Sequence, residues 1–447
     1  MKKFIATLKN IWSIEELRSK ILFTLLLIFI YRVGTHIVLP GIDPTRLQQL
    51  GASASGGILG LIDTFAGGAF SQASIFALGI MPYISASIFM QLMTVLVPQF
   101  QKMQKEGESG RKKINQWTRY LTVGVTLVQA SAYVAYLRQI TSQSQAIIPG
   151  YADYFWLSTV IVLTAGTLFV MWLGEKITDK GLGNGTSLII MVGILARLPQ
   201  SFLQEFTNKS VRTGQILIFI IELAILFAII MGCIMLVQGT RKIPVNYAKQ
   251  IVGNRQFGGA RQFLPIKVNS AGVMPIIFAQ AVLFLPTLFN FTGTATGQGI
   301  ASVFTDHSNV WYMVIYAVVV IGFTFLYTAL IFNPKQIADN LKQNNGFIPG
   351  VKPGQPTADY IGQVMDRITL PGALLLALVG ILPGIAQRLG VTHGFSTFFG
   401  GTSLLIMVGV ILDTLQQIET QLLMRQYDGL MKSGRIQGRQ TVTQASY

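Results

Sequence analysis

A stretch of nine residues that occurs twice decides the fold of this chain: GTSLIIMVG at residues 185–193 and GTSLLIMVG at residues 401–409. Eight of the nine residues are identical in the two copies. A weaker repeat pairs GIMPYISA at residues 79–86 with GVMPIIFA at residues 272–279. Both repeats lie inside apolar segments, so the number of segments between the copies determines what the repeats mean.

The composition is that of a polytopic membrane protein. Of 447 residues, 51% are hydrophobic and only 12% are charged, whereas soluble proteins carry about a quarter charged residues. The single cysteine, Cys233, excludes a disulfide within the chain, and the three scattered histidines suggest no metal site. No nucleotide-binding lysine follows a glycine-rich loop, and no nucleophile motif is present. The sequence therefore predicts neither an enzyme nor a cofactor.

Ten apolar windows are long enough to cross a hydrocarbon core of ~30 Å. Lysines precede the first window, but no small-residue cleavage site follows it, which indicates a retained helix and not a signal peptide. The windows cover residues 21–40, 73–97, 120–138, 154–174, 186–204, 215–237, 270–290, 310–332, 369–387 and 400–423.

The positive charges indicate the orientation of these spans. Of the 34 lysines and arginines, 27 lie in the two termini and in alternate loops, at residues 98–119, 174–184, 238–269 and 333–367. Cytoplasmic loops carry such an excess, so we expect both termini in the cytoplasm. Residues 1–20 are either an amphipathic helix at the membrane surface or a plain basic tail.

The copies of each repeat lie five spans apart, which is an odd number. Two halves related by that offset cross the membrane in opposite directions, as in an inverted-topology repeat. The predicted fold is an all-α polytopic membrane protein with ten transmembrane helices in two inverted five-helix halves. The first half covers residues 21–205, the second covers residues 206–424, and a cytoplasmic tail follows at 425–447.

Residues 56–70 interrupt the apolar pattern between the first two spans. They are too short to cross the membrane, and they are rich in glycine and in apolar residues. One interpretation is a re-entrant segment, which is tolerated at depth only against protein or water. The other is a loop that lies on the membrane surface, and the sequence favours neither.

Four isoleucines occupy equivalent positions in the repeats. Ile84 matches Ile277 in one repeat, and Ile190 matches Ile406 in the other. An isoleucine in a membrane helix usually packs or faces lipid. Four that are related by the internal symmetry would instead converge on its axis, where they predict a hydrophobic constriction that excludes water.

The loops at 238–269 and 333–367 contain patterns of ordered structure, which a loop does not need in order to set the orientation of the membrane spans. Alternating residues at 243–251 and 261–268 predict a projecting β-hairpin with six cations and no acid in its loop. The orientation of the membrane spans, or contact with anionic lipid, would explain the positive charge of these loops but not their ordered structure. A structured hairpin favours docking of a large acidic protein or of ribosomal RNA.

Long motifs distributed over nearly the whole chain resemble those of the SecY family, the central subunits of bacterial protein-conducting channels. The motifs follow the order and spacing of that family. They are SIFALGIMPYISASIFMQ (74–91), KEGESGRKK (105–113), GLGNGTS (181–187), PVNYAK (244–249), LPIKVNSAGVMP (264–275), residues 333–353 and residues 400–405.

The resemblance implies an hourglass pore between the halves, hinged between the fifth and sixth spans and closed at its waist by isoleucines. A sixth family position is often isoleucine but is Thr186 here, which predicts a less apolar waist. The matching isoleucines are Ile80, Ile84, Ile190, Ile277 and Ile406.

The resemblance also implies a plug helix at 56–70 and a lateral gate between the second and seventh spans. An apolar substrate helix leaves such a gate by partitioning into lipid. The implied plug residues are Ile58, Leu59, Leu61, Ile62 and Phe65, and the implied gate residues are Ser85, Ser87, Gln129 and Asn269.

The two large cytoplasmic loops match the docking sites for the ribosome, with its RNA and proteins, and for the SecA motor ATPase. The small subunits SecE and SecG, signal sequences, unfolded preproteins and membrane lipids are the other implied partners. The family usually has arginine where Lys352 stands, and lysine lacks the bidentate fork of arginine. The implied docking residues are Arg241, Lys242, Lys249, Arg255, Arg261 and Lys352.

The function implied by the resemblance is that of a channel subunit and not of an enzyme. Such a subunit passes unfolded secretory polypeptides across the bacterial cytoplasmic membrane and releases hydrophobic helices sideways into it. The alternative is a secondary transporter, which shares the inverted repeats but predicts a polar or charged site where the halves meet.

Overall fold

The computed structural model describes residues 12, 14–43, 63, 66–144, 147–148, 154–210, 215–247, 250–252, 255–257, 261–284 and 309–432. Each of the ten apolar windows overlaps one helix, so the helical architecture is confirmed. These helices are α2 (Glu15–Gly34), α5 (Met81–Leu96), α7 (Glu108–Ser144), α8 (Phe155–Lys180), α9 (Gly185–Ser210), α10 (Gln215–Gln238), α11 (Met274–Phe284), α13 (Val310–Ile331), α15 (Gln355–Arg388) and α17 (Gly401–Lys432).

The described part of the chain contains seven helices that are long and apolar enough to cross a membrane, and eight if one bent pair counts as a span. The bent pair is α5 with α6 (Pro98–Lys105), whose axes differ by 98°. The break falls at Val97, which is extended because a residue before proline disfavours the helical region. The chain is thus a multi-pass membrane protein.

Several helices continue beyond the apolar windows into regions expected to be loops. The loop expected at 98–119 is largely helical, since α6 and the start of α7 occupy it. Hydropathy detects only the apolar part of a helix, whereas Gln, Lys and Arg continue its hydrogen-bond ladder into water. In contrast, the window at 73–97 becomes helical only at Met81, because residues 66–80 form turns with Gly67 and Gly79 at positive φ.

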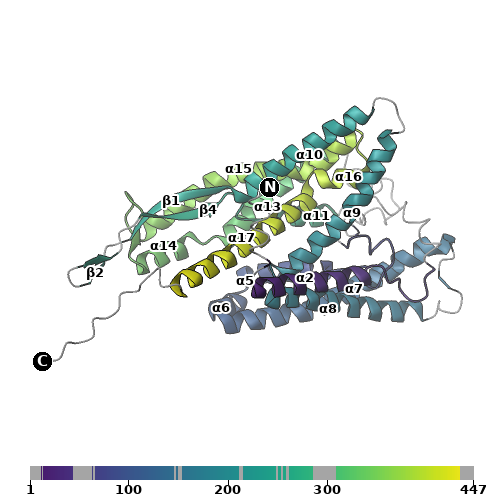
Figure 1. The fold of residues 1–447 in the computed structure, drawn as a ribbon, viewed down its shortest axis with the longest axis horizontal. Helices are drawn as coiled ribbons and strands as arrows, with labels where there is room; N and C mark the ends of the chain where they lie inside the picture. The colour runs from purple at the N-terminus through teal and green to yellow at the C-terminus, as the bar shows by residue number, and fades with distance from the viewer. Residues whose placement is uncertain are drawn as a thin grey trace.

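The predicted β-hairpin is confirmed, and it joins the second large loop in one sheet. Strands β1 (Thr240–Tyr247) and β4 (Arg261–Lys267) pair antiparallel, and β5 (Gly346–Phe347) pairs with the other edge of β1. The short strands β2 (Gln250–Val252) and β3 (Arg255–Phe257) form the tip. Figure 1 shows this sheet and α14 (Pro334–Gln343) at one end of the helical body.

This end has a small hydrophobic core of its own. Ile243 and Val245 of β1 and Ile266 of β4 are buried against Leu341 of α14 and Ile361 of α15. Burial of apolar side chains from two separate loops holds them together as one unit.

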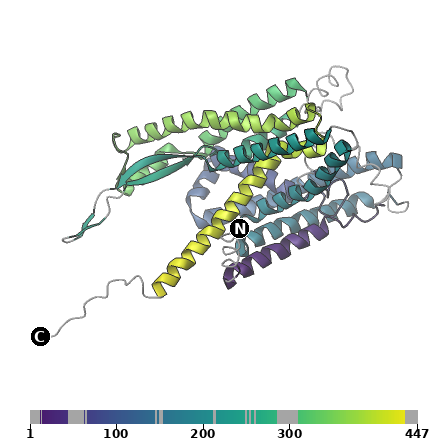
Figure 2. The same ribbon diagram turned by 45° about the horizontal axis from the view of Figure 1, so that its top comes forward.

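The two halves form two groups of helices that meet at α9 and α17. In Figure 1, α2, α5, α7 and α8 lie in the lower group, and α10, α13 and α15 lie in the upper group. Helices α9 and α17 run obliquely between the groups and pack against each other. The turned view in Figure 2 shows α17 crossing the same junction. The short elements α16 (His393–Ser396) and η2 (Thr397–Phe399) precede α17.

Candidate pore and gate

The repeated stretch begins α9 in one half and α17 in the other, and the two helices share a hydrophobic cluster. Ile190 of α9 is buried in this cluster, with 7% of its surface exposed, and the half-buried Ile406 of α17 packs against it. Ile80, the residue before α5, is buried in the same cluster, and the half-buried Ile84 of α5 packs against the cluster. Four of the five isoleucines singled out in the sequence therefore belong to, or pack against, one cluster that contains residues of both halves.

The two other residues of the predicted waist, Ile277 and Thr186, have different environments from these four isoleucines. Ile277 is half-buried and is not among the residues of this cluster, whereas its neighbour Ile276 is fully buried in the core of the second half. The Thr186 hydroxyl donates to Oδ1 of Asn184 at 2.6 Å, and its methyl group faces Gly174 of α8. The polarity that Thr186 brings is thus paired within the first turn of α9.

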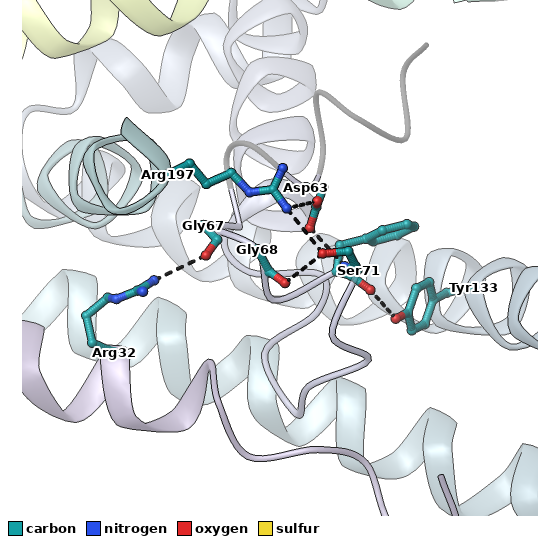
Figure 3. Close-up of polar contacts among 8 residues, drawn as sticks. Arg32, Asp63, Gly67, Gly68, Ser71, Tyr133 and Arg197 are labelled. Atoms are coloured by element: carbon teal, nitrogen blue, oxygen red, sulfur yellow. Dashed lines mark hydrogen bonds and ion pairs between the residues drawn. The ribbon is translucent and has the colours of Figure 1, made fainter. Parts of the chain in front are cut away.

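Residues 66–80 are held to α9 by a charged network, shown in Figure 3. The guanidinium of Arg197 on α9 pairs with Asp63 Oδ2 and donates to Ser71 Oγ at 3.1 Å. The Ser71 amide donates to Asp63 Oδ1 at 2.8 Å. Because the Asp63 side chain is only 7% exposed, its charge requires these partners.

The same segment is held from two other helices. Arg32 of α2 donates to the Gly67 carbonyl at 3.3 Å, and Tyr133 of α7 donates to the Phe70 carbonyl at 2.7 Å. Gly67 has φ +65°, and a Cβ there would lie 2.9 Å from the Cα of Gly193, the last residue of the repeated stretch. The segment thus approaches the backbone of α9 closely (Figure 3).

The predicted plug residues cannot be placed. Ile58, Leu59, Leu61, Ile62 and Phe65 all lie outside the described residues.

A buried ionic cluster lies near the connection between the halves. Lys209 of α9 pairs with Glu205 at 2.9 Å and with Glu222 of α10. Thr392, from the second half, donates its backbone amide to Glu205 at 2.9 Å and also its hydroxyl. The charge of Glu222, which lies inside an apolar window, is therefore paired.

Across the seam between the halves, Tyr327 of α13 donates its hydroxyl to Oε1 of Gln91 on α5 at 2.9 Å. The predicted gate residues have varied environments. Ser85 is exposed and bonds within its own helix, whereas Ser87, Gln129 and Asn269 are half-buried. Oδ1 of Asn269 is buried without a hydrogen-bond partner among the described groups.

The predicted docking residues lie on the sheet end of the molecule. Arg241 and Lys242 are exposed on β1, and Lys352 is exposed in a turn between Gly350 and Gly354, both at positive φ. Arg255 and Arg261 belong to β3 and β4, and Lys249 lies outside the described residues.

Several polar residues of this region were not identified from the sequence. No sequence pattern singled out Asp63, Gln91 or Tyr327, because single polar residues near apolar windows are common. Arg197 and Lys209 did carry a signal, since a charge within or at the end of an apolar window is costly and is often paired.

Two inverted halves that meet at an apolar junction define a membrane channel, whereas a secondary transporter would have a polar or charged substrate site there. The SecY family model matches residues 74–415. The chain is 43% identical to protein translocase subunit SecY of Streptomyces galbus, over 93% of this chain and 97% of that protein. It is 42% identical to the Thermus thermophilus subunit, over 97% and 99%. The chain belongs to the SecY family.

Solved structures share this fold. A protein-conducting channel matches with a TM-score of 0.60 and 16% identity, over 93% of this chain and 94% of that one. Sec61 in the canine ribosome–channel complex matches with a TM-score of 0.55 and 16% identity, over the same shares of the two chains. The chain is a pore-forming subunit of a protein translocase in the bacterial membrane, and the transporter alternative is not supported.

Proposed function

We propose that unfolded secretory polypeptides cross the membrane between the halves, through a waist formed by Ile80, Ile84, Ile190 and Ile406. The observation that carries this proposal is that Ile80 and Ile190 belong to one hydrophobic cluster with residues from both halves, and that Ile84 and Ile406 pack against this cluster. A ring of apolar side chains excludes water when closed and makes no sequence-specific contact with a passing chain. Ile277 is a further waist residue if the second half shifts when the pore opens.

Site-specific crosslinking tests this waist. The single cysteine, Cys233, is buried, so Cys233→Ala gives a background for Ile84→Cys, Ile277→Cys and a control, Val318→Cys, whose residue is 64% exposed on α13. A stalled secretory chain should crosslink at positions 84 and 277 and not at 318. Equal yields at all three positions would show that the polypeptide follows another route.

We propose that residues 66–80 connect a plug to α5 and that the Asp63–Arg197 pair holds this connection in the closed channel. Asp63 accepts from the Ser71 amide of this segment and pairs with Arg197 of α9, the helix that carries Ile190. Movement of the plug region would therefore be coupled to the waist.

We also propose that the seam between α5 and the helices α11 and α13 is the lateral gate. The Gln91–Tyr327 hydrogen bond lies across it. On the second-half side, Phe278 of α11 stacks on Phe323 of α13, with ring centroids 5.6 Å apart. An apolar substrate helix would replace the contact across the seam with its own contacts and then enter lipid. Ser85, Ser87, Gln129 and Asn269 line the proposed gate.

For the sheet end, we propose docking of the ribosome and of the SecA motor, with both termini in the cytoplasm. Exposed cations on a rigid three-stranded sheet support this role, as does the ribosome-bound state of the Sec61 relative. In this proposal, SecE and SecG bind the helical body, and the energy for transport comes from the partners because this subunit does no catalysis. Protease accessibility of a C-terminal tag in inside-out vesicles tests the orientation, and protection of the tag would contradict it.

A further inference from the structure

A cavity of about 60 Å³ lies inside the second half, where α11, α13 and α15 meet the first turn of α17. Its lining is largely apolar but includes Gln280, Tyr316, Thr402 and Ser403. Gln387 and His393 also line it, and these two side chains are paired with each other at 3.1 Å. The cavity thus combines polar groups from several helices in a small space.

The cavity lies at the second copy of the repeat, and the two copies differ in the residue before them. In the first copy, Asn184 caps α9 by accepting from the Thr186 hydroxyl at 2.6 Å and from the Thr186 amide at 3.2 Å. In the second copy that position is Gly400, where a Cβ would lie only 2.3 Å from the Val379 carbonyl oxygen. No side chain at residue 400 can therefore cap α17 as Asn184 caps α9.

Without such a cap, the threonine of the second copy has no hydrogen-bond partner among the described groups. Thr402, the counterpart of Thr186, is 1% exposed, and its hydroxyl has no hydrogen-bond partner among the described groups. Tyr316 is 3% exposed, and its hydroxyl lies near the Gln280 amide but makes no hydrogen bond of good geometry within the described structure. The first N–H groups of a helix also lack intrahelical partners.

The chemistry of the lining selects the ligand. Hydroxyl and amide groups both donate and accept, so an apolar ligand would leave them unpaired. None of the described lining residues is Asp, Glu, Lys or Arg, so an ion would be buried without a counter-charge, which is costly. A neutral, small hydrogen-bonding ligand fits both conditions. A volume of about 60 Å³ exceeds the ~10–15 Å³ that one water molecule needs, so the cavity has room for a small cluster of waters.

We propose that this cavity is a structural water site, in which a small cluster of ordered waters does at the start of α17 what the Asn184 side chain does at the start of α9. The cluster joins Thr402 of α17 to Tyr316 of α13 and Gln280 of α11. The waters add hydrogen bonds to the direct apolar packing of α11 on α17. They can exchange partners when α11 shifts, so that no buried polar group is left unpaired.

Paired substitutions in the full chain, purified in lipid nanodiscs, test the proposal by the sign of a change in Tm. If water bridges the hydroxyls, Thr402→Val and Tyr316→Phe each lower the Tm, by about 1 to 2 °C. The double variant should lose less than the sum, since both side chains share one cluster. Thr186→Val is the matched control, because its hydroxyl has a protein partner and its loss lowers the Tm in any case. A Tm that rises or stays unchanged in Thr402→Val, or effects that add, would overturn the proposal.

A second measurement needs no substitution. X-ray radiolysis generates hydroxyl radicals from bound water, so a buried tyrosine beside water is oxidised faster than one in a dry core. Tyr316 should be modified several-fold faster than Tyr31, which is equally buried but stacks on Phe76 in the apolar cluster. Equal, slow modification of the two tyrosines would show that the cavity is dry.

Discussion

The hydroxyl of Tyr327 on α13 lies 2.9 Å from Oε1 of Gln91 on α5, and this hydrogen bond joins helices of opposite halves. The two residues are 236 positions apart in the chain. In the proposed lateral gate, opening of the seam breaks this bond, so the bond would stabilise the closed state.

Tyr327→Phe should therefore ease opening of the seam. Loss of a net ~0.5–1.5 kcal/mol corresponds to roughly a two- to tenfold larger open population. We expect preproteins with weakly hydrophobic signal sequences to be translocated faster in reconstituted vesicles. Tyr154→Phe, at a residue that is 75% exposed in the turn before α8, is not expected to change this rate. An unchanged rate in Tyr327→Phe would mean that the seam does not open at this bond.

Asp63→Asn should weaken the attachment of residues 66–80 to α9 and raise the ion leak of the resting channel. The Arg197 side chain is 29% exposed, so the cost should be below the ~3–5 kcal/mol of breaking a fully buried pair. Planar-bilayer conductance measures the leak. The exchange Asp63→Arg with Arg197→Asp should restore part of the seal, and Asp413→Asn, at an exposed position, should leave it unchanged. If the exchange leaks as much as the single variant, the pair does not act as a latch.

Ile190→Asn should open the waist to ions without blocking protein transport. A buried amide without a partner costs about 1–3 kcal/mol in the closed state, or roughly 5- to 150-fold in the population of wet pores. Ile190→Leu keeps the apolar volume and should keep the seal. If the folded Ile190→Asn variant does not leak ions, the constriction lies elsewhere in the channel.

Thr186→Ile should reduce the resting leak less than Ile190→Asn raises it. The sequence predicts a less apolar waist at Thr186, but its hydroxyl is paired with Asn184, so little polarity is left for the pore. Bilayer conductance of the two variants gives the comparison. A large drop in leak with isoleucine would show that the threonine does face the pore.

Lys352→Glu should slow SecA-dependent translocation in reconstituted vesicles. The residue is exposed in a turn held by the bond from the Thr357 hydroxyl to the Lys352 carbonyl, at 2.8 Å, so reversal of its charge changes the surface and not the fold. The defect should be larger at low salt, since exposed charges are screened over about 10 Å at 0.1 M. Lys102→Glu, on α6, supplies a control with the same change of charge. Normal transport by Lys352→Glu would remove this residue from the docking surface.

Much of the fold was predictable from the sequence because a membrane imposes local rules. Each span needs a long apolar window, and the cations mark one side of the bilayer. The windows and the offset between GTSLIIMVG and GTSLLIMVG therefore gave ten helices and an inverted repeat. The same symmetry identified Ile84, Ile190, Ile277 and Ile406, and all of these except Ile277 belong to, or pack against, one cluster.

The sequence by itself thus predicted where the ten apolar helices lie, that the halves are inverted and which loop forms a hairpin. Only the tertiary structure decided which distant groups meet. Arg197 pairs with Asp63, which lies 134 positions away in the chain. Strand β5 pairs with β1 from another loop. Thr186 and Thr402 differ in their hydrogen-bond partners, although their surrounding sequences are nearly the same. The physical reason is that span formation depends on each segment's own transfer into lipid, whereas pairing of polar groups depends on how the packed helices cross.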